Sequence, residues 1–227
     1  MKHKAIIFFT RVPKPGEVKT RLHSILTQSQ CCELQSAFIA DVYGAIELTG
    51  YEIIICYTPD GEEDEFHKIL EPYARRPRFL LQRGETLGQR MYHAIYDVLE
   101  QEYDSCLLLG SDIPLITASD MEAGFTHLQN NDITISPTED GGYCVIGMKK
   151  AYAGLFQIEY GGEDVCAETI RKIKSMGLRV AVGKTQLDID DEKDLRKLRG
   201  NLLQNPDLPC PKTRQVLTIF SAKEGKP

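Results

Sequence analysis

Short apolar runs alternate along the chain with longer segments in which apolar residues recur every three or four positions. A short apolar run bounded by charged or turn-forming residues is typical of a strand that is buried on both faces of a sheet. On this basis strands are predicted at residues 4–9, 52–57, 78–82, 106–109, 133–138, 143–148 and 178–182.

The intervening segments predict helices. The clearest covers residues 30–48, where Leu34, Phe38, Val42 and Ile46 share one face and Gly50 follows as a C-terminal stop. Further helices are predicted at residues 62–74, around 91–99, after the capping box of residues 117–120, around 165–173, and in a charged segment that ends at residue 195.

The order of these elements predicts the fold class. Strands that alternate with helices up to about residue 130 imply parallel βαβ units, and the adjacent strands 133–138 and 143–148 then make the sheet mixed. We expect an α/β protein with three α/β/α layers around a mostly parallel mixed sheet. Residues 1–200 are predicted to form one domain, and residues 201–227 a loosely attached tail with a last strand at 215–220.

Composition excludes several classes of protein. The formal net charge of -6 argues against a nucleic-acid partner. The seven cysteines form no CxxC pair and the five histidines no HExxH motif, which disfavours a disulfide framework or a histidine-ligated metal. No apolar run is long enough for a membrane span and no signal-peptide pattern is present, so a cytoplasmic protein is predicted; the oligomeric state stays open.

Asp112 follows the buried run 106–109 and precedes Pro114, which ends strand pairing. In an open parallel sheet the carboxyl end of a middle strand is where ligands bind. An acidic residue there can be an ordinary turn or capping residue, or the carboxylate that holds a divalent cation against phosphates. Asp112 is our first candidate metal ligand.

The segment after the first predicted strand carries Arg11, Lys14, Lys19 and Arg21, with Gly16 between two pairs of them. Four cations in a loop of an acidic protein suit phosphate, because arginine offers a planar fork and lysine a mobile point charge. The alternative is a solvated basic loop. The segment is neither a P-loop nor a Rossmann fingerprint.

Residues 82–91 lead into the next predicted helix and contain Gly84, Gly88 and Arg90. The glycines would let a base or ribose approach the backbone, and Arg90 would face phosphate. A flexible connector explains the same residues equally well.

The sequence Asp140-Gly141-Gly142-Tyr143 separates two predicted strands. A hairpin turn is the plainer interpretation. The functional one is that the glycines clear space for a substrate while Asp140 hydrogen-bonds it or supports a metal.

Asp188 and Asp190 alternate in a short segment before the last charged helix. In an extended chain both side chains point the same way, so both could meet one cation. Alternatively, one of them caps the helix that starts near Asp191.

Four motifs occur in an order that resembles the family of glycosyltransferase-like proteins termed DUF2064. They are Phe8-Phe9-Thr10-Arg11 with Pro15-Gly16-x-x-Lys19-Thr20-Arg21-Leu22, Leu87-Gly88-x-Arg90-Met91, Gly110-Ser111-Asp112-x-Pro114-x-Ile116, and Asp140-Gly141-Gly142-Tyr143-x-x-Ile146-Gly147. That family is similar to 2-phospholactate and molybdenum-cofactor guanylyltransferases. The resemblance covers residues 4–197 and implies a nucleotide-diphospho-sugar transferase (GT-A-like) fold.

The resemblance also implies roles for single residues. Arg11, Gly16, Lys19 and Arg21 match its nucleotide-phosphate loop, Asp112 its metal-binding aspartate, and Asp188-x-Asp190 a late segment where a second ligand, here Asp190, resides. Around Ile158–Gly162 the family usually carries a Trp-Ser/Thr pair, whereas this chain has no Trp. The sugar or acceptor pocket is where the chain departs from the family.

The sequence therefore predicts an Mg²⁺- or Mn²⁺-dependent transferase that uses a nucleoside-phosphate donor. The main interpretation is glycosyl transfer from a nucleotide-sugar to a small-molecule acceptor, with Asp112 and Lys19 offsetting leaving-group charge and Asp140 assisting the acceptor hydroxyl. One alternative is nucleotidyl transfer from a triphosphate to a phosphorylated small molecule. Another is a nucleotide-binding protein without turnover. The predicted nucleotide ligands are Arg11, Lys14, Gly16, Lys19, Arg21, Gly88 and Arg90, and the predicted substrate ligands are Asp140, Gly141, Gly142 and Tyr143.

Overall fold

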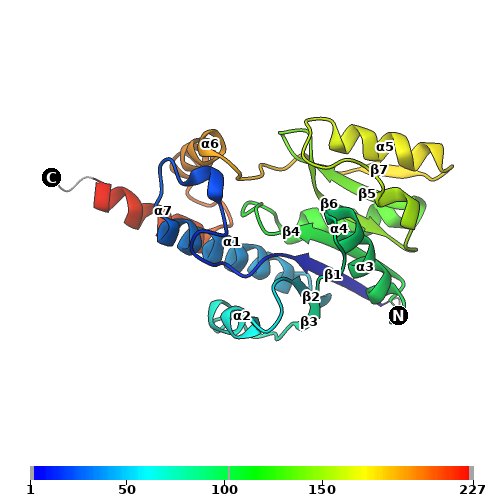
Figure 1. Cartoon of the computed structure of the whole chain (residues 1–227), viewed down its shortest axis with the longest axis horizontal. Helices are drawn as coiled ribbons and strands as arrows, with labels where there is room; N and C mark the ends of the chain where they lie inside the picture. Colours follow the sequence, from blue (N-terminus) through cyan, green and yellow to red (C-terminus); the bar gives the residue numbers. More distant parts are fainter. Residues whose placement is uncertain (1–2, 102, 225–227) are drawn as a thin grey trace.

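A seven-stranded mixed sheet forms the centre of the protein, for which the computed structural model describes residues 3–101 and 103–224 (Figure 1). The strand order is β3-β2-β1-β4-β6-β5-β7. The strands are β1 (Lys4–Phe9), β2 (Glu52–Tyr57), β3 (Arg78–Leu81), β4 (Ser105–Gly110), β5 (Ile133–Pro137), β6 (Tyr143–Met148) and β7 (Val180–Val182). Each lies within or next to a predicted apolar run.

Neighbouring strands from β3 to β4 pair in parallel, and β6 runs antiparallel to both β4 and β5. The expected break in the βαβ alternation is thus confirmed as a β5–β6 hairpin. Strand β7 pairs in parallel with β5. The predicted mixed, mostly parallel sheet is confirmed.

Helices cover both faces of the sheet, as the three-layer prediction required. Helices α1 (Gln28–Leu48), α2 (Glu63–Ile69) and α4 (Ala118–Asn130) pack on one face, and α3 (Leu87–Leu99), α5 (Val165–Ser175) and the short 3₁₀ helix η2 (Ala153–Phe156) on the other. Alternation along β1 sends Ile6 and Phe8 into the first layer and Ala5 and Ile7 into the second.

Local sequence sets the ends of these helices. Thr27 and Gln30 form a capping box that starts α1, and Thr117 and Asp120 form the predicted one that starts α4. Helix α2 ends earlier than predicted because Pro72 disfavours helical geometry in the residue before it.

A third apolar cluster joins the first turns of α1 to two C-terminal helices, α6 (Glu192–Gln204) and α7 (Pro211–Glu224). The strand predicted at residues 215–220 is wrong, because this segment lies inside α7, which runs beside α1 (Figure 1). Residues 201–222 also differ from the expected loose tail, since Cys210 and Phe220 are fully buried. Of the prolines that obscured the helical period, Pro206 and Pro209 precede α7, and Pro211 is its first residue, where proline is tolerated. A domain boundary at residue 200 stays a prediction.

The chain order creates a switch point between β1 and β4. From β1 the chain proceeds outward through β2 and β3 and then returns to the other side of β1 as β4. Loops that leave two neighbouring parallel strands in opposite directions open a crevice at their carboxyl ends. The loops beginning at Thr10 and Ser111 flank this crevice.

None of the helices in the described residues combines the length and the apolar character that crossing a membrane requires.

Candidate functional site

A cleft of about 590 Å³ lies at the carboxyl ends of β1 and β4. Its walls include Arg11, Lys19, Asp112, Asp188 and Asp190, which come from segments far apart in the chain. Because β6 runs antiparallel to β4, the first residues of β6, Tyr143 and Cys144, also reach this end of the sheet. The cleft therefore occupies the crevice that the topology creates.

Three carboxylates converge in the cleft. One oxygen from each of Asp112, Asp188 and Asp190 lies within 4.8 Å of the other two. Leu187 and Ile189 are buried in the third apolar cluster, so alternation along the extended segment turns Asp188 and Asp190 toward Asp112. The two late aspartates face the same way, as their alternation predicts, and the helix cap is Asp191 instead; a shared cation stays a prediction.

Asp188 is the most buried member of this triad. Its Oδ1 is shielded from solvent and has no hydrogen-bond partner among the residues that the structure describes. Burial, followed by the negative charge of Asp112, raises the pKa of Asp188 to about 8. A buried acceptor without a partner is costly, so the site is built for a positive ligand that the described side chains do not fully supply.

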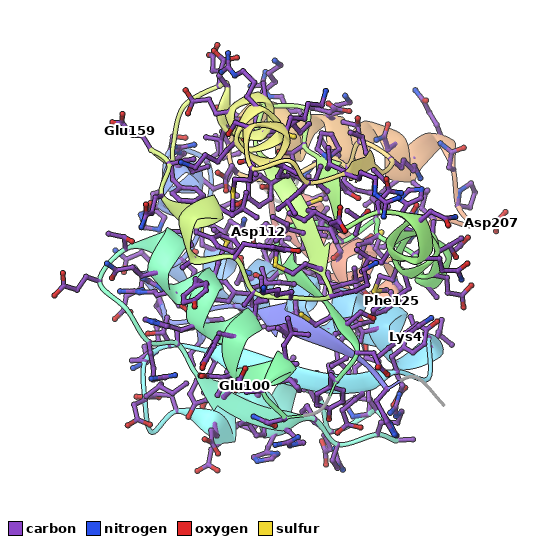
Figure 2. The ribbon with its side chains drawn as sticks, turned by 90° about the vertical axis from the view of Figure 1, so that its right-hand side faces the viewer. Lys4, Glu100, Asp112, Phe125, Glu159 and Asp207 are labelled. Carbon is purple, nitrogen blue, oxygen red and sulfur yellow. The ribbon has the colours of Figure 1, made fainter. Side chains whose placement is uncertain are left out.

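The triad fits a divalent cation. Mg²⁺ and Mn²⁺ prefer carboxylate oxygens, and oxygens around one cation at about 2.0–2.6 Å lie at most roughly 4–5 Å apart. The separations among Asp112, Asp188 and Asp190 meet this condition with small side-chain movements. In Figure 2 Asp112 lies near the middle of the view, whereas Glu159 and Asp207 lie at the rim.

Lys19 reaches into the same triad. Its Nζ lies 2.8 Å from Asp112 Oδ1 and 3.7 Å from Asp190 Oδ1, and it donates to the carbonyl oxygen of Ile189 at 2.6 Å. Only 3% of its side chain is exposed. Arg21 Nη1 lies 3.4 Å from Asp190 Oδ2 and is largely exposed. The metal candidates and two predicted phosphate ligands are thus direct neighbours.

Sequence reasoning missed Gln35, which orients Asp112. The Gln35 amide is buried in α1 and donates to Ser111 Oγ and to Asp112 Oδ1, both at 2.9 Å. Its helical spacing from Phe38 and Val42 signals that it is buried, although not which residue it contacts. Gln82 is a second missed cleft residue, whose amide donates to the carbonyl oxygens of Thr10 and Cys56.

The predicted nucleotide ligands divide into two groups. Arg11, Lys19, Arg21 and Arg90 line the cleft. Within the described part of the chain, Arg11 and Arg90 make no ion pair, although the Arg90 Nε donates to the carbonyl oxygen of Gly84. Two guanidinium groups are therefore available for an anionic ligand.

Lys14, Gly16 and Gly88 are outside the cleft lining. Lys14 Nζ pairs with Glu62 Oε1 at 2.7 Å, and this hydrogen bond raises the pKa of Lys14. A Cβ on Gly88 would lie 2.2 Å from the carbonyl oxygen of Phe156, so this glycine permits α3 to pack on η2. Nucleotide contact by these three residues stays a prediction.

Of the predicted substrate ligands, Tyr143 lines the cleft and Asp140, Gly141 and Gly142 form the hairpin turn. Asp140 Oδ1 accepts hydrogen bonds from Thr138 Oγ1 and from the backbone N–H of Gly142. A Cβ on Gly141 would overlap the carbonyl oxygen of Glu163, so that glycine lets the turn pack against the segment before α5. Burial raises the pKa of Tyr143, whose hydroxyl lies 3.4 Å from that of Tyr160.

The mixed sheet with this cleft defines the class of nucleotide-diphospho-sugar transferase and nucleotidyltransferase folds. A protein from Desulfovibrio desulfuricans G20, provisionally assigned as a nucleotide-diphospho-sugar transferase, superposes with a TM-score of 0.88 and is 31% identical, over 98% of this chain and 96% of that chain. The 4-diphosphocytidyl-2C-methyl-D-erythritol synthase of Anaerococcus prevotii shares the fold, with a TM-score of 0.59 and 14% identity over 89% and 99% of the two chains.

The chain belongs to the DUF2064 family, described as uncharacterized proteins conserved in bacteria, whose model matches residues 42–161. It is also 27% identical over 202 residues to the 2-phospho-L-lactate guanylyltransferase of Methanothermobacter thermautotrophicus. The aligned residues make up 87% of this chain and 84% of that relative. The fold and the family that the sequence motifs predicted are both confirmed.

Proposed function

We propose that this protein is a divalent-metal-dependent nucleotidyltransferase that joins the nucleotidyl group of a nucleoside triphosphate to a phosphorylated small molecule. The observation that carries the proposal is one cleft at the switch point that contains both a carboxylate triad and four cationic side chains, Arg11, Lys19, Arg21 and Arg90. The similarity to a guanylyltransferase across most of both chains supports it.

The reaction places few demands on the protein beyond positioning and charge. A phosphate oxygen of the acceptor attacks the α-phosphorus of the triphosphate, the bond from that phosphorus to the oxygen bridging to the β-phosphate breaks, and pyrophosphate leaves. A phosphate acceptor is already ionised at neutral pH, so no general base is required. Arg11, Arg21 and Arg90 would bind the phosphates and hold the attacking and leaving oxygens in line.

A divalent cation held by Asp112, Asp188 and Asp190 would supply neutralisation of phosphate charge in this reaction. Gln35 keeps the Asp112 carboxylate in place through its 2.9 Å hydrogen bond. Asp188 remains without a partner among the described side chains, and a cation would satisfy it.

Glycosyl transfer is the second candidate, favoured by the provisional assignment of the 31% identical structure. It requires a base for the acceptor hydroxyl. Asp140, predicted for that role, is outside the cleft lining, and its Oδ1 accepts two hydrogen bonds within the turn. The site therefore favours nucleotidyl transfer.

Thermal unfolding against nucleoside triphosphates and nucleotide-sugars, with and without Mg²⁺ or Mn²⁺, tests the donor class. A ligand at a hundred times its dissociation constant adds about 2.7 kcal/mol, which is roughly 5–10 °C for a chain of this size. We expect the largest metal-dependent shift from a triphosphate. A larger shift from a nucleotide-sugar would favour glycosyl transfer.

Turnover is then measured with the preferred triphosphate and a panel of phosphorylated hydroxy acids, with pyrophosphate release as the readout. Asp112→Asn is expected to abolish metal-dependent release. Arg90→Ala should weaken triphosphate binding about tenfold or more, whereas Arg83→Ala, which removes the pair with Asp97 outside the cleft lining, is the matched control. Binding of triphosphate without turnover on any acceptor would support the nucleotide-binding protein instead.

A further inference from the structure

The ammonium group of Lys19 lies against two members of the carboxylate triad. It contacts one oxygen of Asp112 at 2.8 Å and one of Asp190 at 3.7 Å, and the remaining carboxylate, Asp188, has an unpartnered buried oxygen. With its side chain 3% exposed, Lys19 is the most deeply placed cation at this site. A monovalent ammonium partly neutralises three carboxylates and leaves one without a hydrogen bond.

The backbone conformation of Lys19 supports a specific role for this placement. Its φ of 49° and ψ of 40° are left-handed, and Lys19 is the single non-glycine residue with positive φ in the described part of the chain. A left-handed conformation is strained for a non-glycine residue and persists where surrounding contacts impose it. Its carbonyl oxygen accepts the Leu22 N–H at 2.9 Å, and its ammonium contacts Asp112 and the Ile189 carbonyl oxygen, so both ends of the residue are held in place.

The lone pairs of Asp112 Oδ1 are already occupied. This oxygen accepts from Gln35 Nε2 at 2.9 Å and from Ser111 Oγ at 3.4 Å, in addition to contacting Lys19 Nζ. A divalent cation at this oxygen must displace one of them. Gln35 is fixed within α1, whereas Lys19 has a flexible stem and bears the same sign of charge as the incoming cation.

We propose that Lys19 is an internal competitor for the divalent cation, which holds the triad together in the metal-free protein and is released from Asp112 when the metal binds. The released ammonium then becomes a ligand for the triphosphate, and this second step rests on the function proposed above. Metal binding would thus precede and enable the contact between Lys19 and phosphate. Lys19 is a positioning residue in the first step and a substrate ligand in the second.

Lysine acetylation of the unaltered protein tests the release without any change to folding. Burial and the ion pair should protect Lys19 in the metal-free protein, and saturating Mg²⁺ without nucleotide should raise its acetylation rate about tenfold or more, read by peptide mass spectrometry. Lys14, which pairs with Glu62 away from the triad, and the exposed Lys174 are internal controls expected to be unchanged. An unchanged Lys19 rate at Mg²⁺ saturation would mean that the metal binds through other oxygens, and the proposal would be wrong.

Metal affinity provides the second test. Lys19→Met keeps the apolar stem of the side chain without its ammonium group and should raise the affinity for Mg²⁺ by about tenfold or more in calorimetry without nucleotide. Arg21→Met removes the same charge from a side chain that is 72% exposed and that, among the described residues, forms an ion pair with Asp190 alone, so its effect should stay below about threefold. Equal effects of the two variants would show simple charge repulsion and would overturn competition at Asp112.

These experiments separate the two proposals. Release of Lys19 by Mg²⁺ alone, together with a protein that transfers no nucleotide, would uphold the competition and refute the proposed function. Nucleotidyl transfer by a protein in which Lys19 stays protected from acetylation would support the proposed function and refute the competition.

Discussion

The backbone N–H of Ile189 donates to the carbonyl oxygen of Asp112 at 2.9 Å. This bond connects the segment after β7 to the loop after β4. These two segments supply the three aspartates of the carboxylate triad. Because Ile189 is itself fully buried, backbone packing holds Asp112 and Asp188 close together. The charges of the triad are therefore held together at a cost in stability.

Asp188→Asn is expected to stabilise the metal-free protein and to remove its response to Mg²⁺. The substitution keeps the shape of the side chain while removing a carboxyl group whose ionisation is disfavoured by burial and by the charge of Asp112. A gain of about 1–2 kcal/mol corresponds to a rise in Tm of roughly 2–8 °C for a chain of this size, measured by thermal unfolding with and without Mg²⁺.

Asp190→Asn is the matched control. Asp190 is 45% exposed and pairs with Arg21, so its loss should change the free energy of unfolding of the metal-free protein by less than about 1 kcal/mol. A lower Tm for Asp188→Asn with an intact Mg²⁺ response would exclude Asp188 as a metal ligand.

Gln35→Glu is expected to destabilise the metal-free protein more than Gln35→Met. Both variants lose the donor to Asp112, which is worth about 1–3 kcal/mol for a hydrogen bond to a charged group, and Glu also adds a fourth carboxylate to the site. Compared with the unaltered protein at the same Mg²⁺ concentration, the Glu variant should recover part of its lost stability and the Met variant none. Equal recovery in both would show that Gln35 does not contact the metal site.

The sequence was informative wherever one segment determines its own structure. The buried runs at β1, β2 and β4 could be recognised because both faces of a central strand must be apolar, and Asp112 stood out as the acidic residue that follows such a run. The alternation of Asp188 and Asp190 likewise follows from local geometry. These features do not depend on which distant segment packs nearby.

The remainder of the site depends on contacts between distant segments. Lys14 looked equivalent to Lys19 in the basic loop, yet the first pairs with Glu62 and the second enters the triad. Gln35 gives no local sign that it will meet Asp112. Helix α7 was missed because prolines and lysines weakened its period, whereas its burial comes from packing on α1.

Gly88→Ala is expected to lower the stability of the protein by about 1–3 kcal/mol, because the new Cβ would lie 2.2 Å from the backbone oxygen of Phe156. Gly200→Ala in α6 is the matched control, since no atom lies within 4 Å of its Cβ position, and it should gain up to about 1 kcal/mol. Chemical denaturation measures both. An unchanged stability with reduced triphosphate affinity for Gly88→Ala would instead support its predicted contact with nucleotide.

Asp41 links α1 to the start of α7. Its two carboxylate oxygens accept the backbone N–H groups of Lys212 and Thr213, at 3.0 and 2.7 Å. Burial is the largest influence on this carboxyl, and it raises the pKa of Asp41 above the ordinary value of 3.8 in spite of these hydrogen bonds. Asp132 is the opposite case, because the hydrogen bond from the Arg179 backbone N–H lowers its pKa.

The two carboxyls should therefore affect the pH dependence of stability with opposite signs. Folded Asp41 binds its proton more tightly than the unfolded chain, so its contribution declines as pH rises through 3.8 to its folded pKa, by at most about 1.4 kcal/mol per pH unit. Asp132 contributes above pH 3.8, and this contribution is lost as pH falls through its folded pKa. The Tm difference between the unaltered protein and Asp41→Asn should fall between pH 3 and 6, whereas that for Asp132→Asn should rise; slopes of the same sign would contradict the burial assigned to Asp41.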